Sequence, residues 1–401
     1  MGRSTVTRPM TAAVGLSVRN IENNQVTLPQ DHLSRCPDNY TDMEYRRVDN
    51  LLAIEQKLKR RQTSVDEQSR LKRKNRNTVA CFHGISSRAE RNQLVVTHTD
   101  DEKKTRVLLG KNVACASLKG ARDYQEDTCT AARFTLPVKR VEKQFLYHAL
   151  FDGHGGKDCS QFLKSRMLTL FKTRLEQYIK HYGGDLRPAM FNAFKIAFTD
   201  AHFEAIKSGE GTSCGSTATV AVVINHGPSK DRELWVAATG DSPAMLVTPY
   251  RKVIPLSEDA SLDNPLYMES AEKRGLFRME ADCRYLSSLD SEEGINMTRS
   301  LGDGDCAAAI SARPKVVRMM LPQESSQKHL LVQGSDGLFE LIRRYDMGLL
   351  AHKLFTQARN PSALDIASTL VDVSDETTLQ HLKITGEPDQ RDNKTALVSI
   401  L

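Results

Sequence analysis

The sequence predicts an α+β fold in which antiparallel sheets carry helices on their outer faces. Short runs of β-branched and other apolar residues recur from about residue 107 onward, and Gly, Asp or Ser bounds most of them. Two long stretches with helical spacing lie together between groups of these runs, instead of alternating with single strands. Grouped strands and grouped helices are typical of separate layers and not of a doubly wound parallel sheet.

Six apolar segments are expected to be strands, and most are too apolar for a sheet with one face in water. They cover residues 144–151, 217–224, 233–239, 244–248, 329–334 and 395–401. Residues 157–180 and 188–208 repeat apolar residues at the spacing of an amphipathic helix, so each is expected to lay one face on a sheet. Two further helices are expected at residues 345–357 and 361–373.

The beginning of the chain differs from the remainder. It is rich in Asn, Thr, Arg and Gln, contains few aromatic residues and shows no sustained helical or strand period. We therefore divide the chain into a basic, largely mobile extension over residues 1–105 and a folded domain over residues 106–401. With 401 residues, of which 39% are apolar, the chain can bury a full-sized core.

Positive charge is concentrated in the extension. Residues 1–110 hold 20 Lys and Arg against 13 Asp and Glu, whereas the net charge of the whole chain is +6. Nine basic residues fall between Lys57 and Arg76, in two clusters with a polar spacer. Such an arrangement suits a bipartite nuclear-import signal, which makes an import receptor one expected partner. The alternative is a solvated basic helix face. Nucleic-acid binding is disfavoured because no aromatic residues are interleaved to stack on bases.

Several sequence features bear on location and assembly. No apolar stretch is long enough to span a membrane and the start lacks a secretory signal, so we expect no membrane span and a cytoplasmic or nuclear location. The eight cysteines are scattered without a CxxC pair, so we expect reduced, packed thiols. Val6 stands where the N-myristoylation pattern that begins at Gly2 has Ser or Thr, which argues against acylation. No heptads are apparent, and a monomer is expected.

Four acidic motifs lie where predicted strands end or begin. In chain order they are Arg122-Asp123-Tyr124-Gln125-Glu126-Asp127, Asp152-Gly153-His154-Gly155-Gly156, Asp336-Gly337-Leu338-Phe339-Glu340 and Asp392-Asn393. Each motif alone more often marks a plain turn, so the prediction depends on their combination and order. Carboxylates at several strand ends can converge on one point.

Oxygen-rich motifs of this kind predict a site for hard divalent ions. Carboxylates, a backbone carbonyl and water are the ligands that Mg²⁺ and Mn²⁺ prefer in proteins. Gly153 lets the backbone come close enough for its own carbonyl to coordinate. Two ions held about 4 Å apart lower the pKa of a bridging water and orient it for attack on phosphorus. We therefore predict a site for two Mg²⁺ or Mn²⁺ ions.

Together, the motifs resemble those of the metal-dependent serine/threonine protein phosphatases, also called type 2C. The resemblance covers residues 113–401 and includes three further motifs in the family's order, which are Gly215-Ser216-Thr217-Ala218, Ala238-Thr239-Gly240-Asp241-Ser242 and Met297-Thr298-Arg299-Ser300-Leu301-Gly302-Asp303. It implies a four-layer sandwich of two antiparallel β-sheets flanked by helix pairs, with residues 106–401 as the catalytic domain. It also implies a signalling enzyme that hydrolyses phosphoserine and phosphothreonine in phosphoprotein substrates.

The resemblance further implies a role for each metal-site residue. Asp152 would bridge two ions, with Asp336 and Asp392 holding one ion and the carbonyl of Gly153 helping to hold the other. Glu126 would orient a metal-bound water.

Three further residues match the family's site. Asp127 would support the water network from beside Glu126. Arg122 matches a phosphate-binding arginine, whose planar fork suits a phosphoryl group. His154 matches a general acid that would protonate the departing Ser or Thr oxygen, and its alternative role is to order the turn.

The sequence departs from the family pattern at a third, weaker ion site. Asp241 matches one of its ligands, but the other is Glu340, where Asp is usual, so a third ion would bind weakly or in altered geometry. Further differences fall around residues 257–296, a flap that tunes substrate choice in the family.

Besides nucleic-acid binding, two other functions are alternatives. The first is a pseudo-phosphatase, catalytically weak or inactive, that acts as a binding or regulatory module; its usual mark is a lost ligand Asp, and Asp152, Asp336 and Asp392 are all present. The second is another two-metal hydrolase such as a nuclease, which the ordered motif set disfavours.

Overall fold

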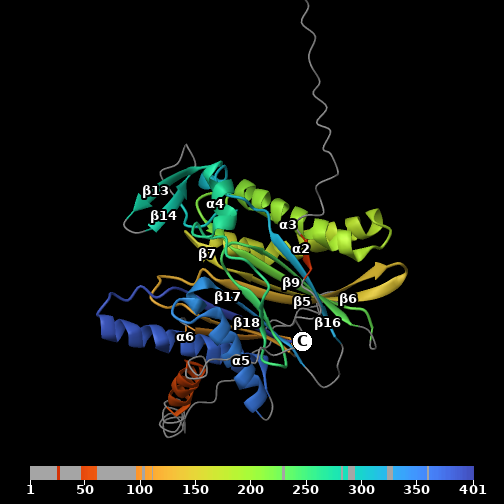
Figure 1. Cartoon of the computed structure of the whole chain (residues 1–401). Coiled ribbons are helices and arrows are strands. Elements are labelled where there is room, and N and C mark those ends of the chain that lie inside the picture. The colour runs from red at the N-terminus through yellow and green to blue at the C-terminus, as the bar shows by residue number, and fades with distance from the viewer. Residues whose placement is uncertain are drawn as a thin grey trace, which may run out of the picture.

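The structure is a computed structural model that describes residues 25–27, 47–60, 96–101, 104–110, 112–227, 231–280, 283–287, 294–322, 328–358 and 361–401. Two β-sheets pack face to face, and helices cover the outer face of each sheet (Figure 1). The layers therefore run helix, sheet, sheet, helix, and the predicted α+β sandwich is confirmed.

Sheet 1 has the strand order β1-β16-β10-β9-β6-β5. Its strands are β1 (Gln25–Thr27), β5 (Thr128–Val138), β6 (Val141–Phe151), β9 (Ala218–Asn225), β10 (Arg232–Thr239) and β16 (Lys315–Leu321). All neighbours are antiparallel except β1 and β16, which are parallel. Side chains of β9 alternate between two cores: Val220 and Val222 face the helices, while Ala221 and Val223 face the other sheet.

Sheet 2 has the strand order β12-β11-β17-β18-β4-β3-β2, with all neighbours antiparallel. Its strands are β2 (Val96–Asp101), β3 (Lys104–Gly110), β4 (Val113–Leu118), β11 (Ala244–Val247), β12 (Val253–Pro255), β17 (Leu330–Gly334) and β18 (Lys394–Ile400). Leu246 and Leu331 of this sheet pack in one core with Val223 of sheet 1. Central strands are thus buried on both faces, which explains why they read as unbroken apolar runs.

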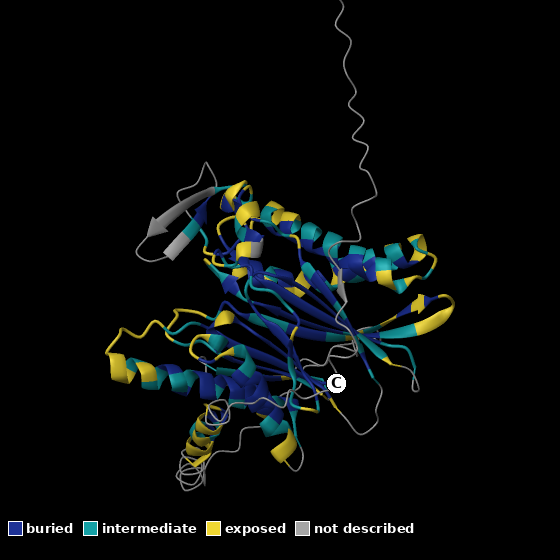
Figure 2. Ribbon diagram, viewed as in Figure 1, coloured by how far each residue is buried: buried dark blue, intermediate teal, exposed yellow. Residues whose placement is uncertain are grey.

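Two pairs of helices form the outer layers. They are α2 (Asp158–His181) with α3 (Leu186–Ser208) on sheet 1, and α5 (Arg344–Gln357) with α6 (Ala363–Thr385) on sheet 2. Their inner faces are buried and their outer faces exposed (Figure 2). Helix α6 is longer than the predicted 361–373. It continues to Thr385 and is terminated by Gly386, a glycine with a left-handed φ of 73°. None of the described helices is both long and apolar enough to cross a bilayer.

The six predicted strands correspond to β6, β9, β10, β11, β17 and β18. Among the strands that were not predicted are β3, β4, β5 and β16. Strand β5 lies at the edge of sheet 1, where its burial alternates along Phe134–Val138 and Pro137 interrupts the apolar pattern. An edge strand with one wet face lacks the apolar run that reveals a central strand.

Parts of the predicted extension are among the described residues. Strands β1 and β2 pair with the two sheets, and a helix over residues 47–60 packs Leu51 into the core beneath α5 and α6. The predicted boundary between residues 105 and 106 falls inside β3. The predicted mobility of the extension, and the basic segment beyond residue 60, concern positions that lie mostly outside the described residues.

One prediction about cysteines is wrong. Cys115 on β4 and Cys129 on β5 form a disulfide that joins the two sheets. The fold lays β4 over β5, so two cysteines that share no sequence motif meet between the layers. Cys159 and Cys214 are free thiols, as expected, and both are buried, as is Cys306.

Several short elements gather at one edge of the sandwich. The flap holds α4 (Pro265–Glu272), β13 (Leu276–Glu280) and β14 (Cys283–Ser287). A small sheet is formed by β15 (Leu301–Gly302), β8 (Gly215–Ser216) and β7 (Gly153–His154), in that order. The 3-10 turns η5 (Gly304–Cys306) and η6 (Asp336–Phe339) complete this edge.

Candidate active site

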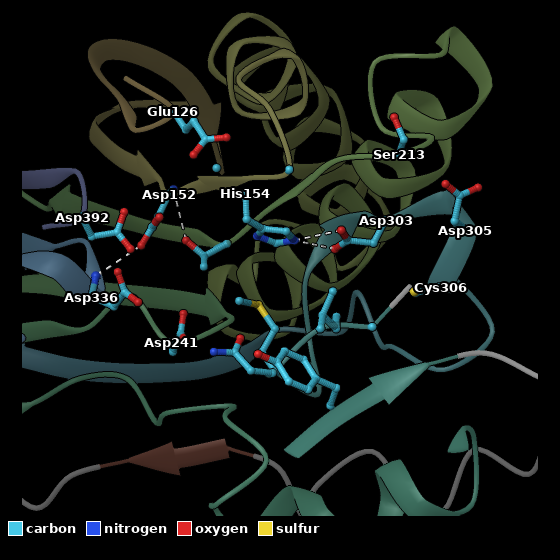
Figure 3. A pocket seen from close by; sticks show the side chains of 18 of the residues that line it. Glu126, Asp152, His154, Ser213, Asp241, Asp303, Asp305, Cys306, Asp336 and Asp392 are labelled. Atoms are coloured by element: carbon cyan, nitrogen blue, oxygen red, sulfur yellow. Dashed lines mark hydrogen bonds and ion pairs between the residues drawn. The ribbon is translucent and has the colours of Figure 1, made fainter. Parts of the chain in front are cut away.

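A cavity of about 360 Å³ opens at this edge of the sandwich (Figure 3). Strand ends from both sheets, the small sheet, the flap residues Tyr285 and Ile295, and Met297 just after the flap form its wall. Eight of the predicted site residues line it, namely Arg122, Glu126, Asp152, Gly153, His154, Asp241, Asp336 and Asp392. The two other predicted residues, Asp127 and Glu340, do not line the cavity.

Three carboxylates, here named the acidic group, converge on the cavity. Asp152 follows β6, Asp241 follows β10, and Asp336 follows β17, so each stands just beyond the end of a strand. One carboxylate oxygen from each residue lies within 4.8 Å of those of the other two. Strands from both sheets therefore bring negative charge to one point.

Hydrogen bonds hold Asp152 in the centre of the acidic group. Its carbonyl accepts hydrogen bonds from the backbone N–H of Thr217 at 2.8 Å and the hydroxyl of Ser216 at 3.1 Å. Its carboxylate accepts from the hydroxyl of Ser242 at 3.0 Å and the backbone N–H of Asp336 at 3.2 Å. These donors come from three different connections, so the position of Asp152 depends on the whole edge of the sandwich.

The acidic group is electrostatically unfavourable by itself. Burial raises the pKa of Asp152 well above its ordinary value, and the charges of Asp127, Asp336 and Asp241 raise it further. Burial, followed by repulsion from Asp336 and Asp259, raises the pKa of Asp241 to about 7. Within the described residues, none of the three carboxylates forms an ion pair with Lys or Arg. An oxygen-only donor set with uncompensated negative charge suits a hard divalent cation.

Gly153 allows two segments of the chain to pack closely beside the acidic group. A Cβ at this position would lie 2.8 Å from the carbonyl oxygen of Glu126 and 3.0 Å from the hydroxyl oxygen of Ser160. A side chain would therefore force apart the two segments that meet beside the acidic group.

Glu126 and Asp127 have different surroundings. The carboxylate of Glu126 accepts a hydrogen bond of 2.7 Å from the backbone N–H of Gly156. Asp127 is buried behind the cavity, and burial raises its pKa to about 7, although the nearby hydroxyls of Thr395 and Ser335 partly oppose the shift. Its position behind the wall agrees with a supporting role instead of direct contact with a ligand.

Arg122 and Asp392 lie together on the wall. The guanidinium of Arg122 donates a hydrogen bond of 2.7 Å to the carboxylate of Asp392, and its side chain is 49% exposed. Asp392 in turn raises the pKa of Asp336 by repulsion, after the larger effect of burial. A half-exposed guanidinium beside these carboxylates is free at one edge to meet an incoming anion.

His154 contacts a residue to which the sequence analysis gave no role. Its Nε2 lies 2.8 Å and 3.0 Å from the two carboxylate oxygens of Asp303. Burial lowers the pKa of His154, but the charge and hydrogen bond of Asp303 raise it, and the net direction is upward. Asp303 ends the motif Met297–Asp303, but sequence spacing does not indicate its contact with His154.

Glu340 is held outside the acidic group. Its carboxylate accepts a hydrogen bond of 3.0 Å from the ammonium of Lys394, which is fully buried. The same ammonium donates to the carbonyl of Gly337 at 2.8 Å and to the hydroxyl of Thr378 at 3.3 Å. Lys394 is the second residue that the sequence analysis missed, because a lysine at the start of a strand ordinarily reads as exposed.

The fold and the site define a class of protein that gathers carboxylates at one edge of a β-sandwich, which is an arrangement suited to hydrolysis with divalent ions. The chain matches the family described as protein phosphatase 2C over residues 112–378. Since this is more than half of the chain, the protein belongs to the protein phosphatase 2C family. The family is one of metal-dependent serine/threonine protein phosphatases.

Individual relatives are distant. Protein phosphatase 1L of Bos taurus is 26% identical over 239 residues, which cover 59% of this chain and 62% of that protein. Mitochondrial protein phosphatase 1K of Xenopus laevis is 29% identical over 234 residues, which cover 56% and 55% of the two chains. The chain spans between about two fifths and three fifths of the length of the first curated relatives that it matches.

Solved structures show the same fold. A serine-threonine phosphatase 2C from Toxoplasma gondii superposes with a TM-score of 0.55 at 19% identity, covering 74% of this chain and 98% of that chain. A sex-determining protein from C. elegans superposes with a TM-score of 0.56 at 20% identity, covering 73% of this chain and 65% of that chain.

Proposed function

We propose that this protein hydrolyses phosphoserine and phosphothreonine in proteins with the help of two Mg²⁺ or Mn²⁺ ions. The observation that supports this proposal most strongly is the convergence of Asp152, Asp241 and Asp336 on a cavity that Arg122 and Asp392 also line. Asp152, Asp336, Asp392 and the carbonyl of Gly153 are the groups proposed to hold the two ions. Such ions lower the pKa of a water molecule and orient it for attack on phosphorus.

The protein's own residues supply binding and proton transfer. The half-exposed fork of Arg122 binds phosphoryl oxygens and places the phosphate beside the acidic group. Glu126, anchored by the N–H of Gly156, orients the attacking water, and Asp127 supports it from behind. His154 gives a proton to the departing Ser or Thr oxygen. The flap residues Tyr285 and Ile295, with Met297 beside them, form the apolar part of the wall against which the substrate backbone lies.

The proposal is tested by phosphate release from p-nitrophenyl phosphate and from a phosphothreonine peptide, with Mn²⁺, with Mg²⁺ and with EDTA. We expect turnover that needs either ion, stops with EDTA and is lost in Asp152→Ala. The variant's circular dichroism should match that of the parent, because Asp152 lies beyond the end of β6 and outside the core. Absence of turnover in the folded, Mn²⁺-loaded protein would instead favour a binding or regulatory module.

A further inference from the structure

Beside the acidic group, a series of hydrogen bonds runs from His154 to the buried residues Asp303 and Ser300. Asp303, whose side chain is 6% exposed, meets the Nε2 of His154 with both carboxylate oxygens. The hydroxyl of Ser300 donates a further hydrogen bond to the same carboxylate. Figure 3 shows His154 between Asp303 on one side and the acidic group on the other.

The small sheet brings Asp303 and His154 together. His154 pairs with Gly215 across β7 and β8, and Gly215 pairs with Gly302 across β8 and β15. Asp303 follows Gly302 directly, so its carboxylate must cross over Gly215 to reach the imidazole. A Cβ at Gly215 would lie 2.1 Å from the nearer carboxylate oxygen of Asp303. The glycine therefore leaves the space through which the contact is made.

The backbone of Asp303 is fixed in an uncommon conformation. Its φ of 50° lies in the left-handed region, which few residues other than glycine adopt. Its N–H donates to the carbonyl of Cys214 at 2.9 Å, and its carbonyl accepts from the N–H of Cys306 at 2.9 Å. Conformations of this kind persist where the surrounding structure over-determines them, and they cluster at functional sites.

We propose that Asp303 is a positioning residue that holds the Nε2 of His154, so that the other ring nitrogen, Nδ1, faces the phosphoester. The proposal rests on the proposed phosphatase function. As the water oxygen bonds to phosphorus, the bond from phosphorus to the Ser or Thr oxygen breaks and leaves its electron pair on that oxygen. The oxygen takes the Nδ1 proton of the His154 imidazolium, which becomes neutral and keeps its Nε2 proton on Asp303. The proton that the attacking water releases then returns to Nδ1, so that charge and protons balance.

Substrates with different leaving groups separate this role from a structural one. p-Nitrophenolate departs without a proton, whereas a threonine alkoxide needs one. We expect Asp303→Asn to lower kcat on a phosphothreonine peptide by about 100-fold, the lower range for loss of general acid catalysis, and to lower kcat on p-nitrophenyl phosphate by less than about threefold. Asp305→Asn, the same change two residues along the same wall, should leave the ratio of the two rates unchanged.

A double variant tests whether Asp303 acts through His154. His154→Gln should show the same dependence on the leaving group, and adding Asp303→Asn to it should produce no further loss, because residues that act as a unit are not additive. Equal losses on both substrates in Asp303→Asn, or additive losses in the double variant, would overturn the proposal.

A measurement that needs no turnover keeps this test independent of the proposed function. In ¹⁵N NMR spectra of the histidine rings, assigned with His154→Gln, the neutral form of His154 should keep its proton on Nε2, the imidazolium form should carry protons on both nitrogens, and the preference for Nε2 should be lost in Asp303→Asn. Unchanged ring signals in Asp303→Asn would contradict the contact itself. Lack of turnover in the parent protein, with the NMR signature present, would contradict the phosphatase proposal and still establish the contact between His154 and Asp303.

Discussion

Two carboxylate environments lie within one short turn of each other, and the fold treats them in opposite ways. Asp336 begins η6 and faces the acidic group, where repulsion and burial raise its pKa. Glu340 directly follows the same turn, but its carboxylate lies on the ammonium of Lys394, which is fully buried. Asp336 is thus left available to a metal ion, whereas Glu340 is already paired with the ammonium of Lys394.

This difference teaches which acidic residues are available to metal ions. Crowded carboxylates without a counter-charge destabilise a folded protein until a cation neutralises them. Glu340 does not need an added cation, since the ammonium of Lys394 already donates hydrogen bonds to Glu340, to the carbonyl of Gly337 and to the hydroxyl of Thr378. We therefore expect Asp336 and Glu340 to respond differently to the same loss of charge.

The largest effect is expected for Asp336→Asn. Removing this carboxylate takes away a proposed ion ligand, and loss of several kcal/mol of charge stabilisation corresponds to a fall in kcat of about 10³-fold. Turnover of p-nitrophenyl phosphate at saturating Mn²⁺ measures the effect, and calorimetric titration with Mn²⁺ should show weaker binding. Wild-type affinity for Mn²⁺ in a folded Asp336→Asn protein would contradict the conclusion that Asp336, unlike Glu340, is available to metal ions.

A smaller effect concerns the stability of the metal-free protein. The pKa of Asp241 is raised to about 7, so its carboxyl stays protonated in the folded state at pH values where the unfolded chain has already ionised. Its contribution to stability is present below pH 4 and is lost as the pH rises through 7. In EDTA, Asp241→Asn should therefore match the wild type below pH 4 and exceed its Tm increasingly between pH 4 and pH 8, by about 2–4 °C for each kcal/mol of stability that the wild type loses.

Thermal unfolding of both proteins across this pH range, with and without Mn²⁺, checks the prediction. Saturating Mn²⁺ should reverse the order of stability, because the ion stabilises only the protein that binds it well. A difference in Tm that is independent of pH would show that the repulsion at Asp241 does not contribute.

The sequence was sufficient for the central layers and for most of the cavity wall. Strands such as β9 and β17 are buried on both faces, so their apolar runs are visible without tertiary information. Acidic residues at strand ends predicted that Asp152 and Asp336 would come together, because strand ends meet at sheet edges, whereas Asp241 was expected only from the resemblance to the family.

Other features depend on contacts between distant segments. The edge strand β5 resembles a loop in its sequence, and the disulfide between Cys115 and Cys129 exists because two layers overlap. The contact between His154 and Asp303 spans 149 positions and requires the small sheet. Lys394 is charged yet fully buried, which only a satisfied network permits.

The smallest effect on ion binding is expected for Glu340→Gln. If Lys394 holds Glu340, the number of Mn²⁺ ions bound, counted by electron paramagnetic resonance, should equal that of the wild type, and kcat should be unchanged. The unfolding free energy should fall by only about 1 kcal/mol, since Glu340 is 39% exposed and glutamine still offers an oxygen to the ammonium. Asp241→Asn is the matched control, and it should weaken ion binding. If Glu340→Gln instead loses a weakly bound ion, then Glu340 must break its ion pair with Lys394 to coordinate that ion. In that case Lys394 would compete with a third ion for Glu340, and it would not permanently take the place of the ion.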